Sequence, residues 1–271
     1  MKTKTLLALA ICFMFVGVGS ISAQTETGIL YKKHTFELEP EISYRTYKEA
    51  DSMREKSMLY GIVVSYTYHK RIMLKAEGIG SIGWVHFSDA GQIDNIRDIR
   101  GLGGYDFPIL KSSILTPYIG IGYSHLNDDF SGKTSTIWAW FPAYEREYTY
   151  IYSPIGTCFL TGLGDRWSLR GIGEYDLFWL GKQKNHIPVT GFNDEYNDIE
   201  TYQRKGFGLR GSIALEKTYK KVIFEGGPFI RYWNIKKSEI ESQTYYGIPV
   251  GSAWEPKNNT TEVGIMLGVR F

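Results

Sequence analysis

Outside its extreme N-terminus, the sequence lacks any apolar run approaching the ~20 residues that a membrane-spanning helix requires. Proline is sparse, at 9 residues, which excludes a collagen-like chain. An excess of positive charge is also missing, because the formal net charge is only +2. The charge balance therefore gives no reason to expect nucleic acid as a partner. Cysteine is limited to two residues, too few for a disulfide-stapled framework.

Aromatic residues and glycine are abundant instead. Aromatics make up 15% of the 271 residues, with 20 Tyr, 14 Phe and 7 Trp, and there are 30 glycines. Disordered chains contain few aromatic residues, so this composition predicts a folded protein.

Residues 1–23 have the features of a secretory signal peptide: two early lysines, an apolar stretch and a small-residue segment. We expect cleavage after Ala23, with the bond after Ser22 as the alternative. Residues 24–271 then form a single exported domain. That domain is formally neutral, because two of the lysines leave with the signal peptide. Its one cysteine, Cys158, leaves no internal disulfide.

Two segments near the ends of the domain alternate strictly between apolar and polar residues, as a β-strand with one apolar face does. In the first, Phe36, Leu38, Pro40, Ile42 and Tyr44 alternate with Glu37, Glu39, Glu41, Ser43 and Arg45. In the last, Thr261, Val263, Ile265, Leu267, Val269 and Phe271 alternate with Glu262, Gly264, Met266, Gly268 and Arg270. Three successive carboxylates opposite five apolar side chains are unusual for a strand of a soluble sandwich.

The same alternation recurs along the domain and predicts ten strands. Their expected ranges are 36–45, 58–69, 72–86, 96–107, 114–126, 147–161, 167–180, 204–216, 222–235 and 261–271. We therefore expect an all-β fold, a closed antiparallel up-and-down transmembrane β-barrel of about ten strands (roughly 8–12). In lipid every backbone polar group needs an internal partner, so a sheet can span only if it closes.

The connections between these strands alternate in length. Short ones lie at 70–71, 108–113, 162–166 and 218–221, and the intervening ones reach about twenty residues. Outer-membrane barrels have short periplasmic turns and long extracellular loops, and an even strand number leaves both termini in the periplasm. Aromatic residues expected at the two membrane interfaces are Tyr68, Trp84, Tyr105, Tyr148, Trp167, Trp179 and Tyr232. The alternative is a soluble, secreted, lipocalin-like barrel whose apolar face points inward.

Three segments carry a resemblance to a known group: RGLGGYDFP, TPYIGIGY followed by SHLNDD, and the C-terminal TTEVGIMLGVRF. With them the chain resembles the small monomeric outer-membrane β-barrels of Gram-negative bacteria, in particular an uncharacterised group. The resemblance covers essentially the whole exported domain and implies fold, monomeric state and outer-membrane location. It also implies that the C-terminal strand ending in Phe271 is recognised by the barrel-assembly machinery. It brings no activity with it.

The motifs of outer-membrane enzymes give little support for catalysis. The five histidines are His34, His69, His86, His125 and His186, and none has the Asp two residues before it that an omptin-like protease would need. A lipid A deacylase would need Ser two residues after a histidine, and His86-Phe87-Ser88 is the one place with that spacing, a tripeptide that by itself is a weak signal. The adjacent Ser124 and His125 would point to opposite faces of a strand. We therefore expect no catalytic residues, with an outer-membrane hydrolase as a distant alternative.

One acidic segment raises the question of a metal. The loop from Asn193 to Glu200, together with Asp128 and Asp129, is rich in the oxygen ligands that Ca²⁺ takes. It lacks the glycine of an EF-hand loop, and a solvated loop beside lipopolysaccharide phosphates is the simpler interpretation. We expect neither a metal site nor a cofactor.

The polar faces of the strands predict a lumen filled with charges of both signs. The expected lumen residues are Glu37, Glu39, Glu41, Lys75, Glu77, Asp98, Arg100, Asp106, Arg170, Glu174, Asp176, Arg204, Arg210, Glu216, Glu225, Arg231, Glu262 and Arg270. A barrel of about ten strands has little room left once such side chains fill it. We therefore expect arginine–carboxylate networks that close the interior.

These features favour a non-enzymatic structural or binding protein of the cell surface. Its expected partners are outer-membrane lipid and lipopolysaccharide, and an unknown ligand of the long loops. The run Trp138-Ala139-Trp140-Phe141-Pro142 is an unusually aromatic loop segment. The alternative function is a narrow pore or a conduit for a small solute or lipid, for which mixed charge predicts weak ion selectivity.

Overall fold

The computed structural model describes residues 32–50, 54–87, 90–129, 145–186 and 198–271. The predicted signal peptide, the aromatic run at 138–142 and the acidic segment up to residue 197 lie outside the described residues. Among those described, no helix is long and apolar enough to cross a bilayer.

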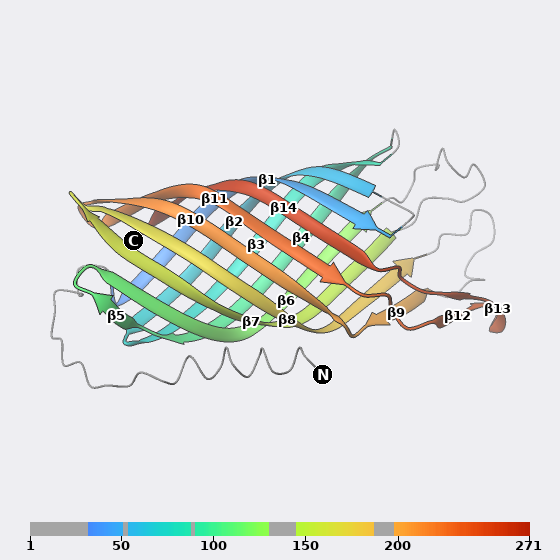
Figure 1. Ribbon diagram of the computed structural model, residues 1–271. Helices are drawn as coiled ribbons and strands as arrows, with labels where there is room; N and C mark the ends of the chain where they lie inside the picture. The colour runs from blue at the N-terminus through green and yellow to red at the C-terminus, as the bar shows by residue number, and fades with distance from the viewer. Residues whose placement is uncertain (1–31, 51–53, 88–89, 130–144, 187–197) are drawn as a thin grey trace.

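The described chain is almost entirely β-structure, and long tilted strands form the wall of one barrel (Figure 1). The strands are β1 (His34–Glu49), β2 (Arg54–Lys70), β3 (Ile72–Phe87), β4 (Ala90–Tyr105), β5 (Phe107–Leu110), β6 (Ser113–Asp129), β7 (Glu145–Gly164), β8 (Trp167–His186), β9 (Ile199–Gln203), β10 (Gly206–Tyr219), β11 (Val222–Ile235), β12 (Glu241–Tyr245), β13 (Ile248–Ala253) and β14 (Asn258–Arg270).

The sheet closes on itself. Neighbouring strands pair antiparallel in the order β1, β2, β3, β4, β6, β7, β8, β10, β11 and β14, and β14 pairs back onto β1. This is the predicted closed barrel of ten strands. Two short strands extend this sheet: β5 pairs with the start of β6, and β9 pairs with the far end of β8. Strands β12 and β13 form a separate hairpin. The β12–β13 hairpin projects beyond the barrel wall (Figure 1).

The two ends of the barrel differ, as the connection lengths predict. The end with the β2–β3, β4–β6, β7–β8 and β10–β11 connections is called the turn end here, and the opposite end the loop end. At the turn end, Asp165 and Arg166 both have positive φ, at 46° and 64°. Two consecutive residues with positive φ match the right-handed twist of a strand pair joined by a two-residue loop.

The strands run further toward the loop end than the sequence patterns predict. The β1–β2 pairing reaches Lys48 and Arg54, and the β3–β4 pairing reaches Phe87 and Ala90. The pairing of β7 with β8 shifts register near Trp179, because β8 carries one extra residue there. The strict alternation of inward and outward side chains is interrupted at this point. This irregularity explains why the alternating pattern stops at residue 180 while the strand continues to His186.

Side chains alternate between an apolar outer wall and a polar lumen. In β1 and β2 the outward residues Phe36, Ile42, Tyr60 and Ile62 are 43–54% exposed, whereas the inward Glu37 and Glu41 are 3% and 6% exposed. An outer wall of large exposed apolar side chains needs a non-aqueous neighbour. The lipocalin-like arrangement, with the apolar face inward, is therefore wrong.

Most of the predicted interface aromatics do face outward, including Trp84 at 61% and Trp179 at 59% exposure. Tyr148 is the exception and was wrongly predicted. It is 3% exposed and lies in the lumen, where its ring contacts Tyr47 and its hydroxyl accepts a hydrogen bond from Gln183. On β7 the side chain of Tyr148 points inward, as do those of Tyr150 and Tyr152.

Candidate functional site in the barrel lumen

The lumen gathers charged side chains from the barrel strands, as predicted. The inward faces of β1, β3, β4, β8, β10, β11 and β14 supply all of the expected lumen residues except Arg204 and Asp106. Asp106 follows β4 directly and is also buried, at 9% exposure. Arg204 was wrongly predicted: the chain leaves the wall between β9 and β10, and Arg204 pairs outside with Glu239 at 2.9 Å.

Nearest the turn end, Arg170 of β8 is the centre of one charge cluster. Its guanidinium lies 3.0 Å from a carboxylate oxygen of both Glu37 and Glu39 and 3.1 Å from Glu216, and it also contacts Glu225. Arg270 of β14 lies 2.5 Å from Glu216 and 3.4 Å from Glu225, so it shares two of these carboxylates with Arg170. We call Arg170, Arg270 and their carboxylates the Arg170 cluster. Its members come from five neighbouring strands, β8, β10, β11, β14 and β1, so it ties about half of the wall together.

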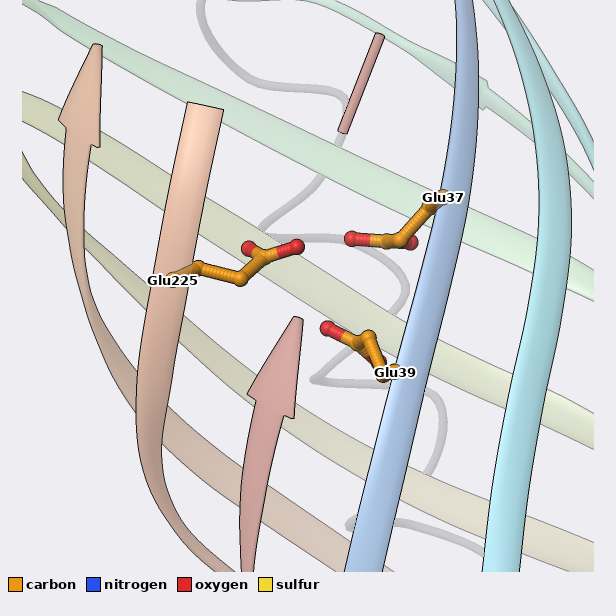
Figure 2. A group of neighbouring side chains, drawn as sticks. All are labelled: Glu37, Glu39 and Glu225. Carbon is orange, nitrogen blue, oxygen red and sulfur yellow. The ribbon is translucent and has the colours of Figure 1, made fainter. Parts of the chain in front are cut away.

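Within this cluster, the carboxylates of Glu37, Glu39 and Glu225 point toward one another (Figure 2). One oxygen from each lies within 4.8 Å of the others, a spacing that would suit a metal ion. The guanidinium of Arg170 is already bound to all three residues, however. An arginine therefore supplies the positive charge that a metal ion would bring, and the arrangement gives no support for a metal site.

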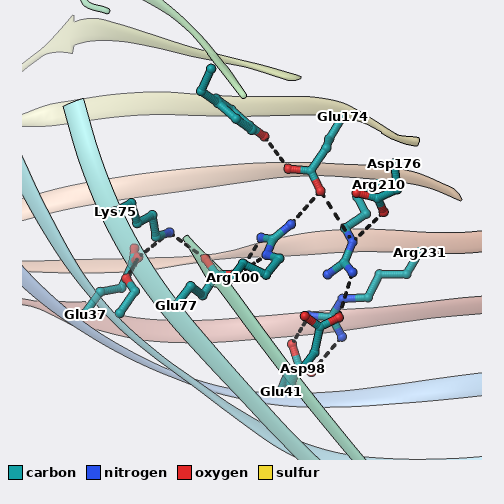
Figure 3. Close-up of polar contacts among 12 residues, drawn as sticks. Glu37, Glu41, Lys75, Glu77, Asp98, Arg100, Glu174, Asp176, Arg210 and Arg231 are labelled. Carbon is teal, nitrogen blue, oxygen red and sulfur yellow. Dashed lines mark hydrogen bonds and ion pairs between the residues drawn. The ribbon is translucent and has the colours of Figure 1, made fainter. Parts of the chain in front are cut away.

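Further along the lumen, Arg100 and Arg210 form a second cluster with shared carboxylates (Figure 3). Arg100 donates to Glu77 and, at 2.5 Å, to Glu174. Arg210 donates at 2.9 Å to Asp176 and at 2.7 Å to Asp98. Glu174 lies 3.4 Å from Arg210 and joins the two guanidinium groups.

Arg231 lies beside this cluster and links β11 to β1. Both of its terminal nitrogens donate at 2.8 Å to the two oxygens of Glu41, and one also donates at 3.1 Å to Glu262 (Figure 3). A two-point contact of this kind fixes the planes of both groups as well as their separation. Because Glu41 belongs to β1 and Arg231 to β11, the contact crosses the intervening strand β14.

Aromatic rings fill the lumen above the arginines. Trp233 of β11 packs edge-on against Tyr152 and Phe178, at 5.1 and 6.2 Å between ring centres, and Tyr150 lies 5.7 Å away. A Cβ on the facing Gly122 would lie 2.2 Å from the ring of Tyr152, so glycine makes room for it. Sequence analysis noted the tyrosine run but not its inward direction. The inward-facing Glu225 and Arg231 on β11 could have signalled that Trp233 faces the lumen too.

Two small cavities of about 70 Å³ each lie between the side chains of the lumen. Arg210, Arg231 and Ile79 line both, so they lie between the two cavities. A cavity of this volume holds only a few water molecules.

At the loop end a third cluster lies inside the mouth. Arg45 donates at 2.8 Å to the fully buried Asp94, and Arg146 donates at 2.7 Å to Glu55. Asp128, which sequence analysis considered for a loop metal site, is also buried here, 3.9 Å from Arg146. It faces the lumen and not the solvent. Sequence analysis missed Arg146, Glu55 and Asp94 because it assigned their segments to loops.

Glu255, from the connection between β13 and β14, lies inside the mouth. Its carboxylate accepts a hydrogen bond from Tyr47 at 2.9 Å, and its backbone N–H donates to the hydroxyl of Ser238 at 2.7 Å. The side chain is buried, with 5% of the residue exposed. Burial and the nearby carboxylate of Glu49 raise the pKa of Glu255 to about 7.

Two of the histidines can be placed by their contacts. His125 contacts Thr149 at 3.2 Å, and Ser124 points to the other face of β6. His69 contacts Asp106 at 3.0 Å, and Thr116 donates to the other oxygen of the same carboxylate at 2.7 Å. The adjacent Ser124 and His125 therefore do not form a nucleophile–base pair, which needs direct contact.

Structure comparison finds outer-membrane β-barrels. The outer-membrane protease OmpT of Escherichia coli matches with a TM-score of 0.58 and 7% identity, covering 88% of this chain and 96% of OmpT. The translocator domain of NalP from Neisseria meningitidis matches at 0.43 and 9%, covering 97% and 94%. The toluene transporter TodX of P. putida matches at 0.37 and 8%, covering 92% of each chain.

No protein-family model and no curated protein matches the sequence. At identities this low, the structural likeness establishes the fold alone. The chain therefore folds like the β-barrels of the Gram-negative outer membrane, which is the coarser part of what the sequence predicts.

Proposed function

We propose that this chain is an integral outer-membrane barrel with a closed lumen, which presents its loop-end hairpins at the cell surface and catalyses no reaction. The observation that carries the proposal is a series of side-chain layers along the lumen. From the turn end they are the Arg170 cluster, the Arg100–Arg210 cluster, the rings packed around Trp233, and the buried Glu255 in the mouth. Each is formed by side chains from several strands. A solute would have to break ion pairs in low dielectric to pass, which is costly.

The loop end supports a surface role. The β12–β13 hairpin projects beyond the wall and exposes apolar residues, with Tyr246 at 67%, Ile248 at 66% and Val250 at 55%. Single exposed apolar residues are ordinary, but a group of them on a projecting hairpin is typical of a contact surface.

The absence of catalysis is proposed on sequence grounds together with the contacts above. OmpT is a protease, but no histidine of this chain has Asp two residues before it. The buried carboxylates near the mouth are bound to Arg45 and Arg146. We expect purified protein to leave peptide, phospholipid and lipid A substrates unchanged, and lipid A is the sharpest test because His86-Phe87-Ser88 has the spacing of a deacylase motif.

A narrow conduit is the second candidate. It is favoured by the two cavities that lie on either side of Arg210, Arg231 and Ile79. A displacement of the arginine side chains would join them. Carboxylates outnumber cations among the buried lumen residues, so such a path would favour cations.

Conductance of the purified protein in a planar bilayer separates the two candidates. We expect a heat-modifiable, folded barrel without discrete openings. An Arg210→Ser variant removes one of the side chains between the two cavities and should give small openings, which shows that the assay detects a leak. Discrete openings of the unmodified protein would overturn the closed barrel in favour of the conduit.

We also propose that the C-terminal strand is the part recognised during assembly. β14 closes the barrel against β1, and the backbone N–H of Phe271 donates to Phe36 at 2.9 Å while its side chain faces outward, 53% exposed. Phe271→Ala keeps the backbone contact and removes only the exposed ring. The folded fraction in the outer membrane should fall, whereas refolding of the purified variant in detergent should be unchanged. Normal folded levels in cells would contradict the proposal.

A further inference from the structure

Four cations lie together on the outer wall at the loop end, across the seam of β14, β1 and β2. They are Lys48 of β1, Arg54 and Lys56 of β2, and Lys257, which directly precedes β14, and all four are exposed. Lys48 and Arg54 are directly opposite in the β1–β2 register, and Lys56 follows two residues along the same face. Lys257 is adjacent, because its carbonyl accepts a hydrogen bond from Ala50 at 3.0 Å. We call these four residues the seam patch.

This placement is unfavourable for the isolated barrel. Like charges directly opposite one another on neighbouring strands destabilise a sheet. None of the four forms an ion pair with a carboxylate among the residues that the structure describes. The flanking carboxylates of β1 and β2, Glu49 and Glu55, face the other way, and Arg146 binds them inside the lumen at 3.8 and 2.7 Å. Asp51 lies outside the described residues.

Three other cations at the loop end are neutralised within the protein. On β8 the outward Lys182 lies 2.7 Å from Glu200, and Lys184 lies 2.8 Å from Asp198. The exposed Arg204 has Glu239 at 2.9 Å. The seam patch differs from these three in having its flanking carboxylates turned inward, so its charge can meet an external anion.

The wall below the patch indicates what kind of anion fits. On the same outward face and the same two strands, the next residues are Tyr44 and Met58, followed by Ile42 and Tyr60, and all four are 39–54% exposed. A ligand that lies along this wall meets apolar side chains first and cations at its top. Asn259, paired with Lys48 in the β1–β14 register, adds an amide to the polar end.

We propose that the seam patch binds the phosphate groups of a lipid in the outer leaflet, whose acyl chains lie against Tyr44, Met58 and the wall below them. This inference rests on the proposed membrane location. A lipid phosphate fits better than a soluble anion, because only the lipid matches both the cations and the continuous apolar surface. Guanidinium and ammonium groups together supply several donors for phosphate oxygens.

Nanodiscs test the proposal. The purified barrel is reconstituted in phosphatidylcholine nanodiscs that contain either bisphosphorylated lipid A or the same lipid without phosphates, and the bound lipid is measured. We expect selective binding of the phosphorylated form. The Lys48→Gln/Arg54→Gln variant should bind it about 30-fold more weakly, at roughly one kcal/mol for each cation removed near the membrane surface.

The matched control is Lys182→Gln/Lys184→Gln, which removes two rim cations that already have carboxylate partners. It should bind the phosphorylated lipid normally. Equal binding of the two lipids, or an equal loss in the control, would overturn the proposal. Competition by inorganic phosphate as strong as that by the lipid would also overturn it, because the ligand would then be a soluble anion. A folded, heat-modifiable barrel that inserts into the nanodisc but shows no lipid preference would contradict the proposed role of the seam patch. It would leave the proposed membrane location intact.

Discussion

In the closed barrel proposed above, the two ends of the lumen would be closed in different ways. In the Arg170 cluster every charged group belongs to a barrel strand, so this closure would be part of the wall. At the mouth, Arg45 and Arg146 also belong to strands, but Glu255 comes from a connection outside the sheet. We expect the first closure to be lost only when the barrel deforms, and the second to be released while the barrel stays intact.

The difference predicts where stability is global and where it is local. Removing a strand-borne charge leaves its partners buried in a rigid wall, and the whole barrel is affected. Releasing the connection near Glu255 exposes only the mouth, because segments with few contacts open independently of the sheet. Each of the following predictions tests this contrast, in order of decreasing expected effect.

Arg170→Ala should have the largest effect. It leaves Glu37, Glu39, Glu216 and Glu225 without their common cation, and breaking buried pairs typically costs about 3–5 kcal/mol, less whatever entering water restores. Urea unfolding in detergent measures the loss.

The matched control is Arg204→Ala, which removes an arginine of a solvent-exposed ion pair and should cost under about 1 kcal/mol. Equal losses in the two variants would mean that the lumen is hydrated, and that the Arg170 cluster does not differ from the surface.

Glu255 should make the mouth sensitive to pH. Because burial and Glu49 raise its folded-state pKa to about 7, above the ordinary value of 4.5, its contribution to stability is present at acidic pH and is lost as the pH rises through 7. Between about pH 5 and pH 8 the loss should be roughly 2 kcal/mol, seen as a change in the fluorescence of the adjacent Trp254.

Glu255→Gln removes the ionisation and keeps the hydrogen-bonding shape. The fluorescence change of Trp254 across this pH range should then disappear. A Trp254 transition that persists in the variant would show that another group controls the mouth.

Ser238→Ala should have a smaller and local effect. The Ser238 hydroxyl accepts the backbone N–H of Glu255 at 2.7 Å and donates to the carbonyl of Glu239. Loss of such a contact costs about 1 kcal/mol. Hydrogen exchange of residues 254–257 should become faster while the urea midpoint stays unchanged. A lower midpoint would show that the mouth and wall unfold together.

Cysteine labelling on intact cells tests the orientation of the barrel in the outer membrane. The substitutions should leave the stability of the barrel unchanged. With Cys158 replaced by Ser, a cysteine introduced at Ser252 in the projecting β13 should react with a membrane-impermeant reagent. One introduced at Asp165 in the β7–β8 turn should not. The reverse pattern would place the turn end outside and exchange the roles of the two closures.

Much of the wall could be predicted from the sequence. Strict alternation, as in the segment from Phe36 to Arg45, assigns each side chain to the lumen or the outer wall without knowledge of its neighbours. The alternating connection lengths then give the strand number and the two ends. The limits appeared where the alternation breaks, as near Trp179, or where the chain leaves the wall, as at Arg204.

The sequence by itself determined that charges of both signs face the lumen, because period two is a local property of the chain. Only the tertiary structure decided which charges meet. Arg170 and Glu39 are 131 residues apart, and their contact depends on the tilt and closure of the whole sheet. The inward turn of Glu49 and Glu55 toward Arg146, which leaves the seam patch without a carboxylate partner among the described residues, was likewise decided by closure. So was the position of Glu255 inside the mouth, since no local pattern brings a loop carboxylate back into a barrel.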